Sequence, residues 1–301
     1  MNKLTLWNTR AITNKEIEIN YLIFKENPEV LALCETWLKD KDKFKIPNYQ
    51  IVRKDRKNQI GGGLAFCIKN SIQYKEIKLN DNQESKFETQ AIKIPFNNRW
   101  LNILLIYNPC NNISKEEIEP YANQLDEPKL IMGDLNAHHP FWEPNLNSKL
   151  TNKTGKNVFD FLTNNSEILL TPPGQITRID PKTGKTSTID LIKGSPNLSH
   201  LEITVGSHLN SDHLPIIVKN NNQNSHSNKE RKWHFTKEGW TKYKKELNKF
   251  KVENTISLPT IANVLKEMGK KCFKFENNVT KTKPNKPWWN ENCHKEKKQS
   301  F

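Results

Sequence analysis

A short apolar run at residues 130–132 ends in polar side chains that could perform chemistry. The chain continues through Asp134, Asn136, His138 and His139. Asp and Asn also end strands without any further role, because their side chains hydrogen-bond to nearby backbone groups. A carboxylate, an amide and two imidazoles at one strand end therefore indicate a site only if other parts of the chain supply matching groups.

Other strand-like runs of the chain also border polar residues. These residues are Asn8, Glu35, Asp190 and the pair Asp212-His213. Each one alone is more often a turn or a cap, but in open α/β sheets side chains from distant strand ends meet at one edge. Carboxylates and amides suit a hard divalent cation such as Mg2+, and a nearby imidazole can stabilise an anion. The set therefore predicts metal-assisted chemistry on a phosphodiester.

The five cysteines do not provide an alternative metal site. They form no CxxC pair, and no further Cys or His lies at zinc-ligand spacing from His138 and His139. An odd number of cysteines also argues against a disulfide framework and favours a reducing compartment. A zinc ribbon and a disulfide-stabilised secreted domain are thus excluded as function classes.

The elements that must position these polar groups alternate along the first 220 residues. Apolar residues at helical spacing predict helices over 15–26, 115–125 and 156–164, with Asn14 capping the first. Glycines 61–63 open a strand and indicate a turn, because no helix start follows them as in a phosphate loop. Apolar runs predict strands over 4–7, 30–34, 64–68, 87–94, 100–107, 130–132, 186–192, 201–205 and 214–218.

A polar linker over residues 221–232 divides the chain into a domain at 1–220 and a basic, partly helical extension at 233–301. Residues 223–301 carry 19 Lys and Arg against 8 Glu and no Asp, which is most of the net charge of +14. This charge favours nucleic acid through counterion release. The alternatives are a solvated lysine-rich surface and docking on a polymerase domain. No apolar run approaches the roughly 20 residues of a membrane helix, and no secretory signal is visible.

The order of the motifs resembles the endonuclease/exonuclease/phosphatase superfamily, and within it the apurinic-type endonucleases of non-LTR retrotransposons. The motifs are WN, ETWL, GGGLAF, YNP, GDLNAHH with Trp142, STID and SDHLP, spread over residues 4–218. The resemblance implies a four-layered α/β sandwich like DNase I, in which two packed mixed sheets are flanked by helices. Residues 286–290 (KPWWN) resemble the segment that leads to a reverse transcriptase, which this sequence does not contain.

The resemblance also implies roles for the polar residues. Glu35 would bind Mg2+, with Mn2+ as a substitute, helped by Asn8, and Asp212 would be a second carboxylate near the metal. Asp134 would orient or deprotonate the attacking water. His138 and His139 would be structural or face DNA, and Trp142 would pack beneath the site.

Four further residues complete the implied catalytic group. Asn136 would hold the phosphate, and Tyr107 would reach it through its hydroxyl. His213 would stabilise the charge that develops on the phosphate, and Asp190 would orient His213 and favour its imidazolium form.

The implied substrate is double-stranded DNA. Thr177 and Ser211 match positions that contact the DNA backbone in the family. A basic hairpin with Arg178, Lys182 and Lys185 is expected to enter the minor groove. Arg10 stands where apurinic repair enzymes have an Asp, which favours the retroelement branch.

The predicted activity is a nick that leaves a 3′-hydroxyl to prime reverse transcription in the nucleus, after passage through the cytoplasm. Element RNA or a polymerase domain acting in trans would be further partners. Two alternatives stay open: an inactive or domesticated remnant that only binds nucleic acid, and a phosphoesterase of the same fold acting on small substrates.

Overall fold

The computed structural model describes residues 3–57, 59–80, 87–109, 113–164, 167–220, 231–234, 236–249 and 258–277. The chain forms two compact units, residues 1–223 and 224–301, which are treated separately below. Most of the linker predicted at 221–232, and all of the segment 286–290, lie outside the described residues.

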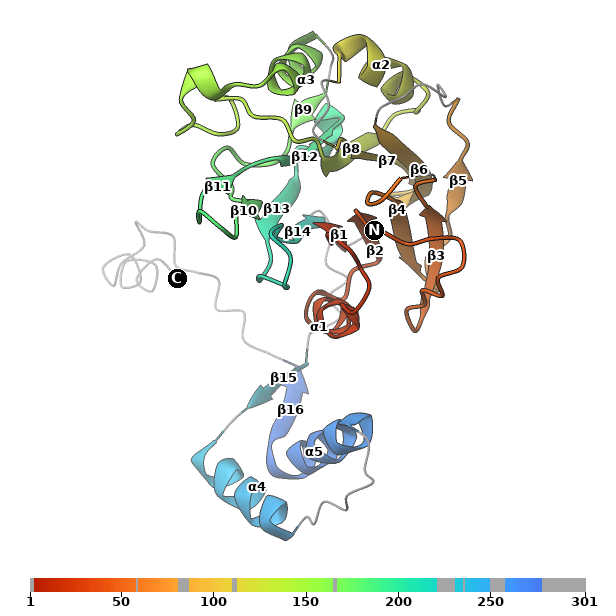
Figure 1. Ribbon diagram of the computed structural model, residues 1–301. Helices are drawn as coiled ribbons and strands as arrows, with labels where there is room; N and C mark the ends of the chain where they lie inside the picture. Colours follow the sequence, from red (N-terminus) through yellow and green to blue (C-terminus); the bar gives the residue numbers. More distant parts are fainter. Residues whose placement is uncertain are drawn as a thin grey trace, which may run out of the picture. The chain divides into compact units, whose positions relative to one another are not determined.

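The first unit contains two six-stranded mixed sheets (Figure 1). In the first sheet, β1 pairs in parallel with β2, and every other pair is antiparallel. Its strands, in spatial order, are β13 (Leu201–Val205), β14 (Ile216–Asn220), β1 (Lys3–Asn8), β2 (Val30–Cys34), β4 (Leu64–Lys69) and β3 (Tyr49–Lys54).

The second sheet repeats this plan around the parallel pair of β7 and β8. Its strands, in spatial order, are β5 (Lys75–Ile77), β6 (Glu88–Phe96), β7 (Arg99–Tyr107), β8 (Lys129–Asp134), β12 (Asp190–Gly194) and β9 (Ile168–Leu169). A separate hairpin pairs β10 (Arg178–Ile179) with β11 (Thr186–Ser187). Short 3-10 turns occur at Ser148–Leu150 and Pro196–Leu198.

Alternating side chains distribute the apolar residues of each strand between two cores. In β2, Val30, Ala32 and Cys34 belong to the core between the sheets. Leu31 and Leu33 face the opposite way, toward the core that also holds α1 (Glu16–Glu26). A third core packs α2 (Lys115–Asn123) and α3 (Lys153–Asn164) on the second sheet. The order helix, sheet, sheet, helix is the four-layered sandwich that the sequence predicted, and this fold class is confirmed (Figure 1).

The local predictions were less complete than the fold class. The strand predicted at 186–192 is interrupted, because residues 188 and 189 leave the hairpin before β12 begins. Asn14 was wrong as the cap of the first helix, since Lys15 occupies that position and makes no side-chain capping hydrogen bond. The edge strand β3 had no prediction, because polar residues interrupt its apolar pattern.

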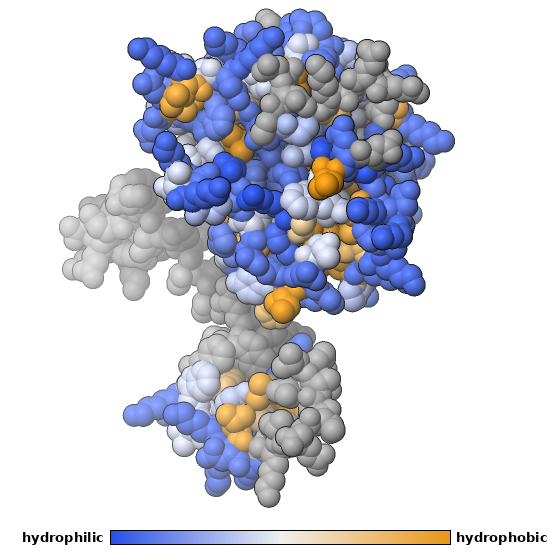
Figure 2. Space-filling view, viewed as in Figure 1, coloured by the Kyte–Doolittle hydropathy of each residue, from blue (hydrophilic) through white to orange (hydrophobic). Residues whose placement is uncertain are grey.

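The second unit contains a hairpin of β15 (Arg231–His234) and β16 (Lys274–Asn277) with helices α4 (Lys237–Lys249) and α5 (Leu258–Cys272). The rings of Trp240 and Tyr243 pack against Phe273, with centroids 5.0 and 5.7 Å away. The face of the protein in Figure 2 is mostly hydrophilic, with small isolated hydrophobic patches. None of the helices in the described ranges has both the length and the apolar character that crossing a membrane requires.

Candidate active site

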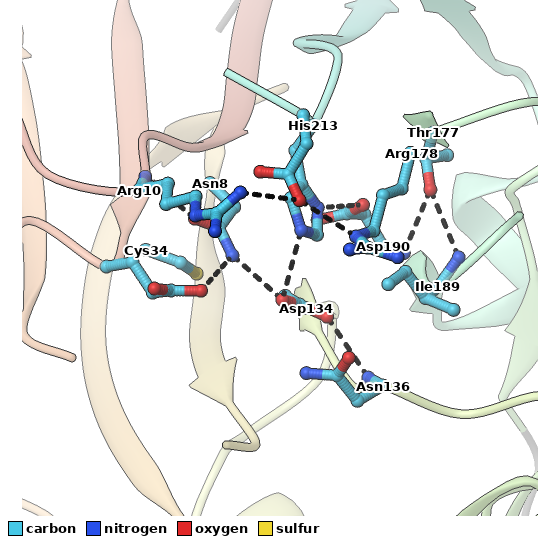
Figure 3. A network of polar contacts seen from close by, with 12 residues as sticks. Asn8, Arg10, Cys34, Asp134, Asn136, Thr177, Arg178, Ile189, Asp190 and His213 are labelled. Carbon is cyan, nitrogen blue, oxygen red and sulfur yellow. Dashed lines mark hydrogen bonds and ion pairs between the residues drawn. The ribbon is translucent and has the colours of Figure 1, made fainter. Parts of the chain in front are cut away.

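Sheet register brings the predicted polar residues together at one end of the two sheets. Asn8 pairs with Cys34, the residue before Glu35, in the parallel pair of β1 and β2. In the second sheet, Asp134 at the end of β8 lies between Tyr107 and the first residue of β12, Asp190. Figure 3 shows Asn8 from the first sheet lying close to Asp134 and Asp190 from the second.

Gly133 allows Asp134 to reach this position. Its φ is +152°, and a Cβ there would collide with the carbonyl oxygen of Ile106 on β7. Only glycine permits this close approach without displacing the neighbouring strand. The glycine in the GDLN motif is therefore explained by packing directly below the carboxylate.

One amide group joins the carboxylates of the two sheets. The Asn8 Nδ2 donates to Glu35 Oε1 at 2.8 Å and to Asp134 Oδ2 at 2.8 Å. The other oxygen of Asp134 accepts from the backbone N–H of Asn136 at 3.1 Å. Asn8 and Asp134 are almost completely buried. These bonds fix the orientation of both carboxylates before any ligand binds.

His213 and Asp190 form a second buried pair beside Asp134. The His213 Nδ1 lies 2.8 Å from Asp190 Oδ2, and the His213 Nε2 lies 3.8 Å from Asp134 Oδ2. This geometry leaves the Nε2 side of the ring facing Asp134, where a substrate oxygen could be contacted. The backbone N–H of His213 donates to Ser211 Oγ at 3.2 Å.

The charges in this group set the protonation of both residues. Burial raises the pKa of Asp134 to about 7, although His213 opposes the shift, and Asp190 adds to it. Burial lowers the pKa of His213, but the carboxylates of Asp190 and Asp134 outweigh it and raise the value to about 9. At neutral pH His213 is therefore an imidazolium, and Asp134 can gain or lose a proton.

Tyr107 completes the site from the end of β7. Burial raises the pKa of its hydroxyl, and the nearby carboxylates of Glu35 and Asp134 raise it further. Tyr107 is also hydrogen-bonded to Glu35. The guanidinium of Arg56 lies 5.5 Å from the centre of the Tyr107 ring and pairs with Glu88. Tyr107 therefore stays a neutral hydrogen-bond donor at all physiological pH values.

The donor set of the site fits a divalent cation. Glu35 and Asp134 share the Asn8 amide, and Asp190 pairs with His213, so the network holds three carboxylates and one imidazole. Asp134, Asp190 and His213 form the cluster of the described chain whose ligand atoms lie within 4.8 Å of one another. However, His213 Nδ1 and Asp190 already bond to each other, so oxygen ligands from Glu35 and Asn8 suit a hard ion better.

Asp212 contacts the rim of the site through one of its carboxylate oxygens. Its Oδ2 lies 3.0 Å from Arg178 Nε and 3.4 Å from Arg10 Nη1. Its Oδ1 is buried and has no hydrogen-bond partner among the described residues, so the role of Asp212 as a second carboxylate near the metal stays a prediction. The sequence placed Asp212 correctly beside His213 but could not show its ion pairs.

Thr177 and Ser211 form hydrogen bonds to the backbone beside the site. Both side chains are buried. The Thr177 hydroxyl accepts from the backbone N–H groups of Ile189 and Asp190, each at 3.1 Å. The Ser211 hydroxyl donates to the Asn8 carbonyl oxygen at 2.9 Å. Both hydroxyls support the backbone beside the site, and their contact with a DNA strand stays a prediction.

The basic hairpin that the sequence predicted is present as the pair β10 and β11. Arg178 begins β10 and forms a bridge with His213. Lys182 and Lys185 are exposed in the turn, where Asp180 accepts from the backbone N–H of Lys182 at 3.0 Å. These lysines are not part of the buried site, but they are free to contact a substrate that reaches beyond it.

The histidines of the GDLNAHH motif support the loop that follows β8. His138 Nδ1 lies 2.8 Å from Glu143 Oε2, and the other oxygen of Glu143 accepts from the backbone N–H of Thr188 at 2.9 Å. The His139 ring stacks on Phe159 with centroids 4.4 Å apart. Trp142 is fully buried. Sequence reasoning missed Glu143, because nothing local indicates that it links this loop to the segment before Asp190.

Comparisons with known proteins agree with the fold. Residues 101–217 match a family model described as endonuclease-reverse transcriptase. A probable RNA-directed DNA polymerase from transposon BS of Drosophila melanogaster is 23% identical over 233 residues, which are 75% of this chain. Those residues cover 25% of that relative, so the chain spans about a quarter of its length.

Solved structures of three similar proteins share the fold. The endonuclease domain of TRAS1, a telomere-specific non-LTR retrotransposon, matches with a TM-score of 0.59 and 13% identity, covering 74% of this chain and 100% of that one. The APE2 catalytic domain of Xenopus laevis (TM-score 0.57, 15% identity) covers 72% and 90%. An AP endonuclease from Archaeoglobus fulgidus (TM-score 0.55, 15% identity) covers 73% and 100%.

These findings confirm the predicted resemblance to the endonuclease/exonuclease/phosphatase superfamily. The similar proteins include a transposon polymerase and the endonuclease domain of a non-LTR retrotransposon. The chain therefore has the fold of a nuclease, with a cluster that could hold a metal.

Proposed function

We propose that the protein is a Mg2+-dependent DNA endonuclease that nicks one strand of nuclear DNA and leaves a 3′-hydroxyl. The observation that carries the proposal is the single network that joins Glu35, Asn8 and Asp134 beside the His213–Asp190 pair. A carboxylate for the cation, a carboxylate for water and an imidazolium for the phosphate are the groups that hydrolysis of a phosphodiester needs.

Each residue of the site has its own role in the proposed reaction. Asp134 orients a water and accepts its proton, for which a pKa of about 7 is well placed. The oxygen of this water attacks phosphorus in line, and the bond from phosphorus to the 3′-oxygen breaks. The 3′-oxygen leaves and takes a proton from a solvent water, which gives the 3′-hydroxyl, and the other strand end keeps a 5′-phosphate. Asp134 then returns its proton to solvent. Mg2+ held by Glu35 and Asn8 would supply charge stabilisation on the phosphate oxygens.

Three residues stabilise the phosphate during this step. His213 as imidazolium donates from Nε2, and Asp190 holds its ring from the other side. The hydroxyl of Tyr107 is a neutral donor next to Glu35. Asn136 donates through Nδ2 to the Asn108 carbonyl oxygen at 2.7 Å and keeps a second hydrogen for a phosphate oxygen.

A duplex substrate is favoured over a small phosphoester by the basic groups outside the buried site. Arg10 and Arg178 flank Asp212 at the rim, and Lys182 and Lys185 extend from the hairpin. A small phosphate ester would not reach the hairpin. Release of inorganic phosphate from small esters, without nicking of DNA, would support the phosphoesterase alternative. Binding without any hydrolysis would support the remnant alternative.

The chemistry of the nicked ends tests the proposal. Plasmid nicked by the protein in Mg2+ should serve directly as a primer for a DNA polymerase, because the 3′-oxygen leaves as a hydroxyl. Incorporation of labelled nucleotide should need no prior phosphatase treatment, and EDTA present during nicking should abolish it. Nicks that prime synthesis only after a 3′-phosphatase acts would contradict the proposed bond cleavage.

The hairpin should select the position of the nick. Replacing residues 182–185 with a Gly-Ser turn removes both exposed lysines and leaves Thr177, Asp190 and His213 in place. We expect a changed distribution of nicks along a plasmid, mapped by sequencing, with a nicking rate within about threefold of the original because groove contacts specify and catalysis lies elsewhere. An unchanged distribution would remove the hairpin from DNA recognition.

A further inference from the structure

Trp37 lies at the rim of the site and no role has so far been assigned to it. Its indole Nε1 donates to Glu35 Oε2 at 3.0 Å, so it holds the oxygen that Asn8 does not. The side chain is nevertheless 39% exposed. An aromatic ring that anchors a candidate metal ligand and also meets solvent can contact both the site and a substrate.

The backbone at this position is held in an uncommon conformation. Glu35 and Trp37 have φ values of +51° and +55°, which are unusual for residues with side chains. The backbone N–H of Trp37 donates to the Gly62 carbonyl oxygen at 2.9 Å, and that of Thr36 donates to the Gly63 carbonyl oxygen at 3.2 Å. The triple glycine therefore fixes the ETWL turn, and strain of this kind concentrates at functional positions.

A groove of about 910 Å3 is lined by residues of the segments 12–20 and 37–47. Its lining includes the buried apolar residues Ile12, Leu38 and Ile46, and the exposed Trp37. An exposed aromatic residue beside apolar lining suits a flat, partly apolar group such as a nucleobase.

The rim of the groove is basic. Its exposed lysines recur at alternate positions, namely Lys39, Lys41, Lys43 and Lys45. The acidic lining residues are Glu16 and Asp42, and the Asp42 carboxylate accepts from the backbone N–H of Lys39 at 2.8 Å. Four exposed lysines together with an exposed aromatic residue are complementary to a nucleic acid strand, which offers phosphates to the cations and bases to the ring.

We propose that this groove binds the DNA strand that continues from the scissile phosphate, with one base stacked on Trp37 and the phosphates along the lysines. Trp37 is then both a substrate contact and a positioning residue for Glu35. This inference rests on the proposed function, because it takes the strand from the site beside Glu35. It adds a binding site that lies outside the catalytic group and away from the hairpin at residues 178–187.

The two roles of Trp37 can be separated by substitution. Trp37→Phe keeps an aromatic face but loses the indole N–H, whereas Trp37→Ala loses both. Trp100→Ala is the matched control, because Trp100 is 36% exposed and lies at the opposite end of β7 from Tyr107. The double variant Lys41→Gln/Lys43→Gln tests the groove without changing the ring.

Binding is measured in EDTA, by fluorescence anisotropy of a labelled duplex with a single-stranded overhang, so that no cleavage is needed. We expect Trp37→Ala to weaken binding about 10-fold, from the value of base stacking on an aromatic side chain. Trp37→Phe and Trp100→Ala should bind like the original. The lysine variant should lower the slope of log affinity against log salt by about 2, from two lost phosphate contacts.

The positioning role has its own readout. Titration calorimetry with Mn2+ should give about 10-fold weaker binding for Trp37→Phe, because residues that orient a metal ligand affect affinity by this order. Unchanged Mn2+ affinity would overturn the positioning role. Unchanged DNA affinity in Trp37→Ala, or an unchanged salt slope in the lysine variant, would overturn the groove.

Failure of this inference is distinguishable from failure of the proposed function. If the original protein nicks plasmid and Trp37→Ala binds DNA normally, the groove proposal is rejected and the endonuclease proposal stands. If the original protein binds DNA through Trp37 but does not nick plasmid, the endonuclease proposal is rejected and the groove proposal stands. Circular dichroism of each variant ensures that a loss of binding is compared between folded proteins.

Discussion

Replacing Asp134 with Asn is expected to slow plasmid nicking in Mg2+ by a factor of about 10² to 10⁴, the range for loss of a general base. The Asp134 carboxylate accepts hydrogen bonds from the Asn8 amide and the Asn136 backbone N–H, and His213 Nε2 lies 3.8 Å away from it. Asparagine keeps the size of the side chain but cannot accept a proton from water.

The loss in this variant should come from chemistry and not from unfolding. Asp160→Asn is a suitable control, because Asp160 is an exposed carboxylate on α3. It should nick at the original rate. DNA affinity in EDTA should be preserved in Asp134→Asn, since a buried carboxylate contributes no attraction to the phosphate backbone. A variant that nicks within tenfold of the original protein would remove Asp134 as the base.

Replacing His213 with Gln should reduce nicking by about 10² to 10³, as for loss of one donor to a developing anion. The residue is almost fully buried, with Nδ1 on Asp190 and Nε2 toward Asp134. Glutamine can donate a neutral hydrogen bond but lacks the positive charge. Rates measured under single-turnover conditions would separate this step from product release.

Asp190→Asn isolates the charge that keeps His213 protonated. In the original protein, His213 carries a proton up to a pKa of about 9, because the two carboxylates outweigh burial. Without the Asp190 charge, burial lowers this pKa, so the alkaline limb of the nicking profile should move to lower pH. If the alkaline limb stayed in place, the imidazolium would not be the active form.

The raised pKa of His213 also makes the free energy of unfolding depend on pH. The pKa of His213 in the folded protein is raised above the ordinary histidine value of 6.5. Its contribution to the free energy of unfolding is therefore complete below about 6.5 and is lost as the pH rises through about 9. This window is the one in which the alkaline limb of activity should also appear.

The sequence predicted the fold class well because its signals are local. Val30–Cys34 and Leu201–Val205 are continuous or alternating apolar runs, and their bounds match the observed strands. The resemblance of the GDLNAHH and SDHLP motifs to the superfamily then predicted the four-layered α/β sandwich. The edge strand β3 was missed, since its polar residues are tolerated by exposure on one face and leave no periodic pattern.

The site was predictable where strand ends supply its members. Asn8, Asp134 and Asp190 follow from register, because paired strands end together. Long-range partners were not predictable. The ion pairs of Asp212 with Arg10 and Arg178 join segments far apart in the chain, as does the bond of Glu143 to Thr188. No spacing in a single sequence encodes such contacts.

Trp37 is a further residue whose contacts could not be predicted from the sequence. The ETWL motif contributed to the resemblance through Glu35, and the tryptophan two residues later was read only as part of the pattern. Its hydrogen bond to Glu35 occurs where both Glu35 and Trp37 have left-handed backbone, and the backbone N–H of Trp37 donates to the Gly62 carbonyl oxygen. Backbone conformation of this kind follows from tertiary contacts and not from residue type.

The most direct test of the central claim is nicking of supercoiled plasmid by the purified full chain in Mg2+, beside Asp134→Asn and an EDTA control. The account predicts conversion of supercoiled to open-circular DNA that requires the metal and is lost in the variant. Equal conversion by the original protein and by Asp134→Asn, or nicking that persists in EDTA, would contradict the assignment of this site.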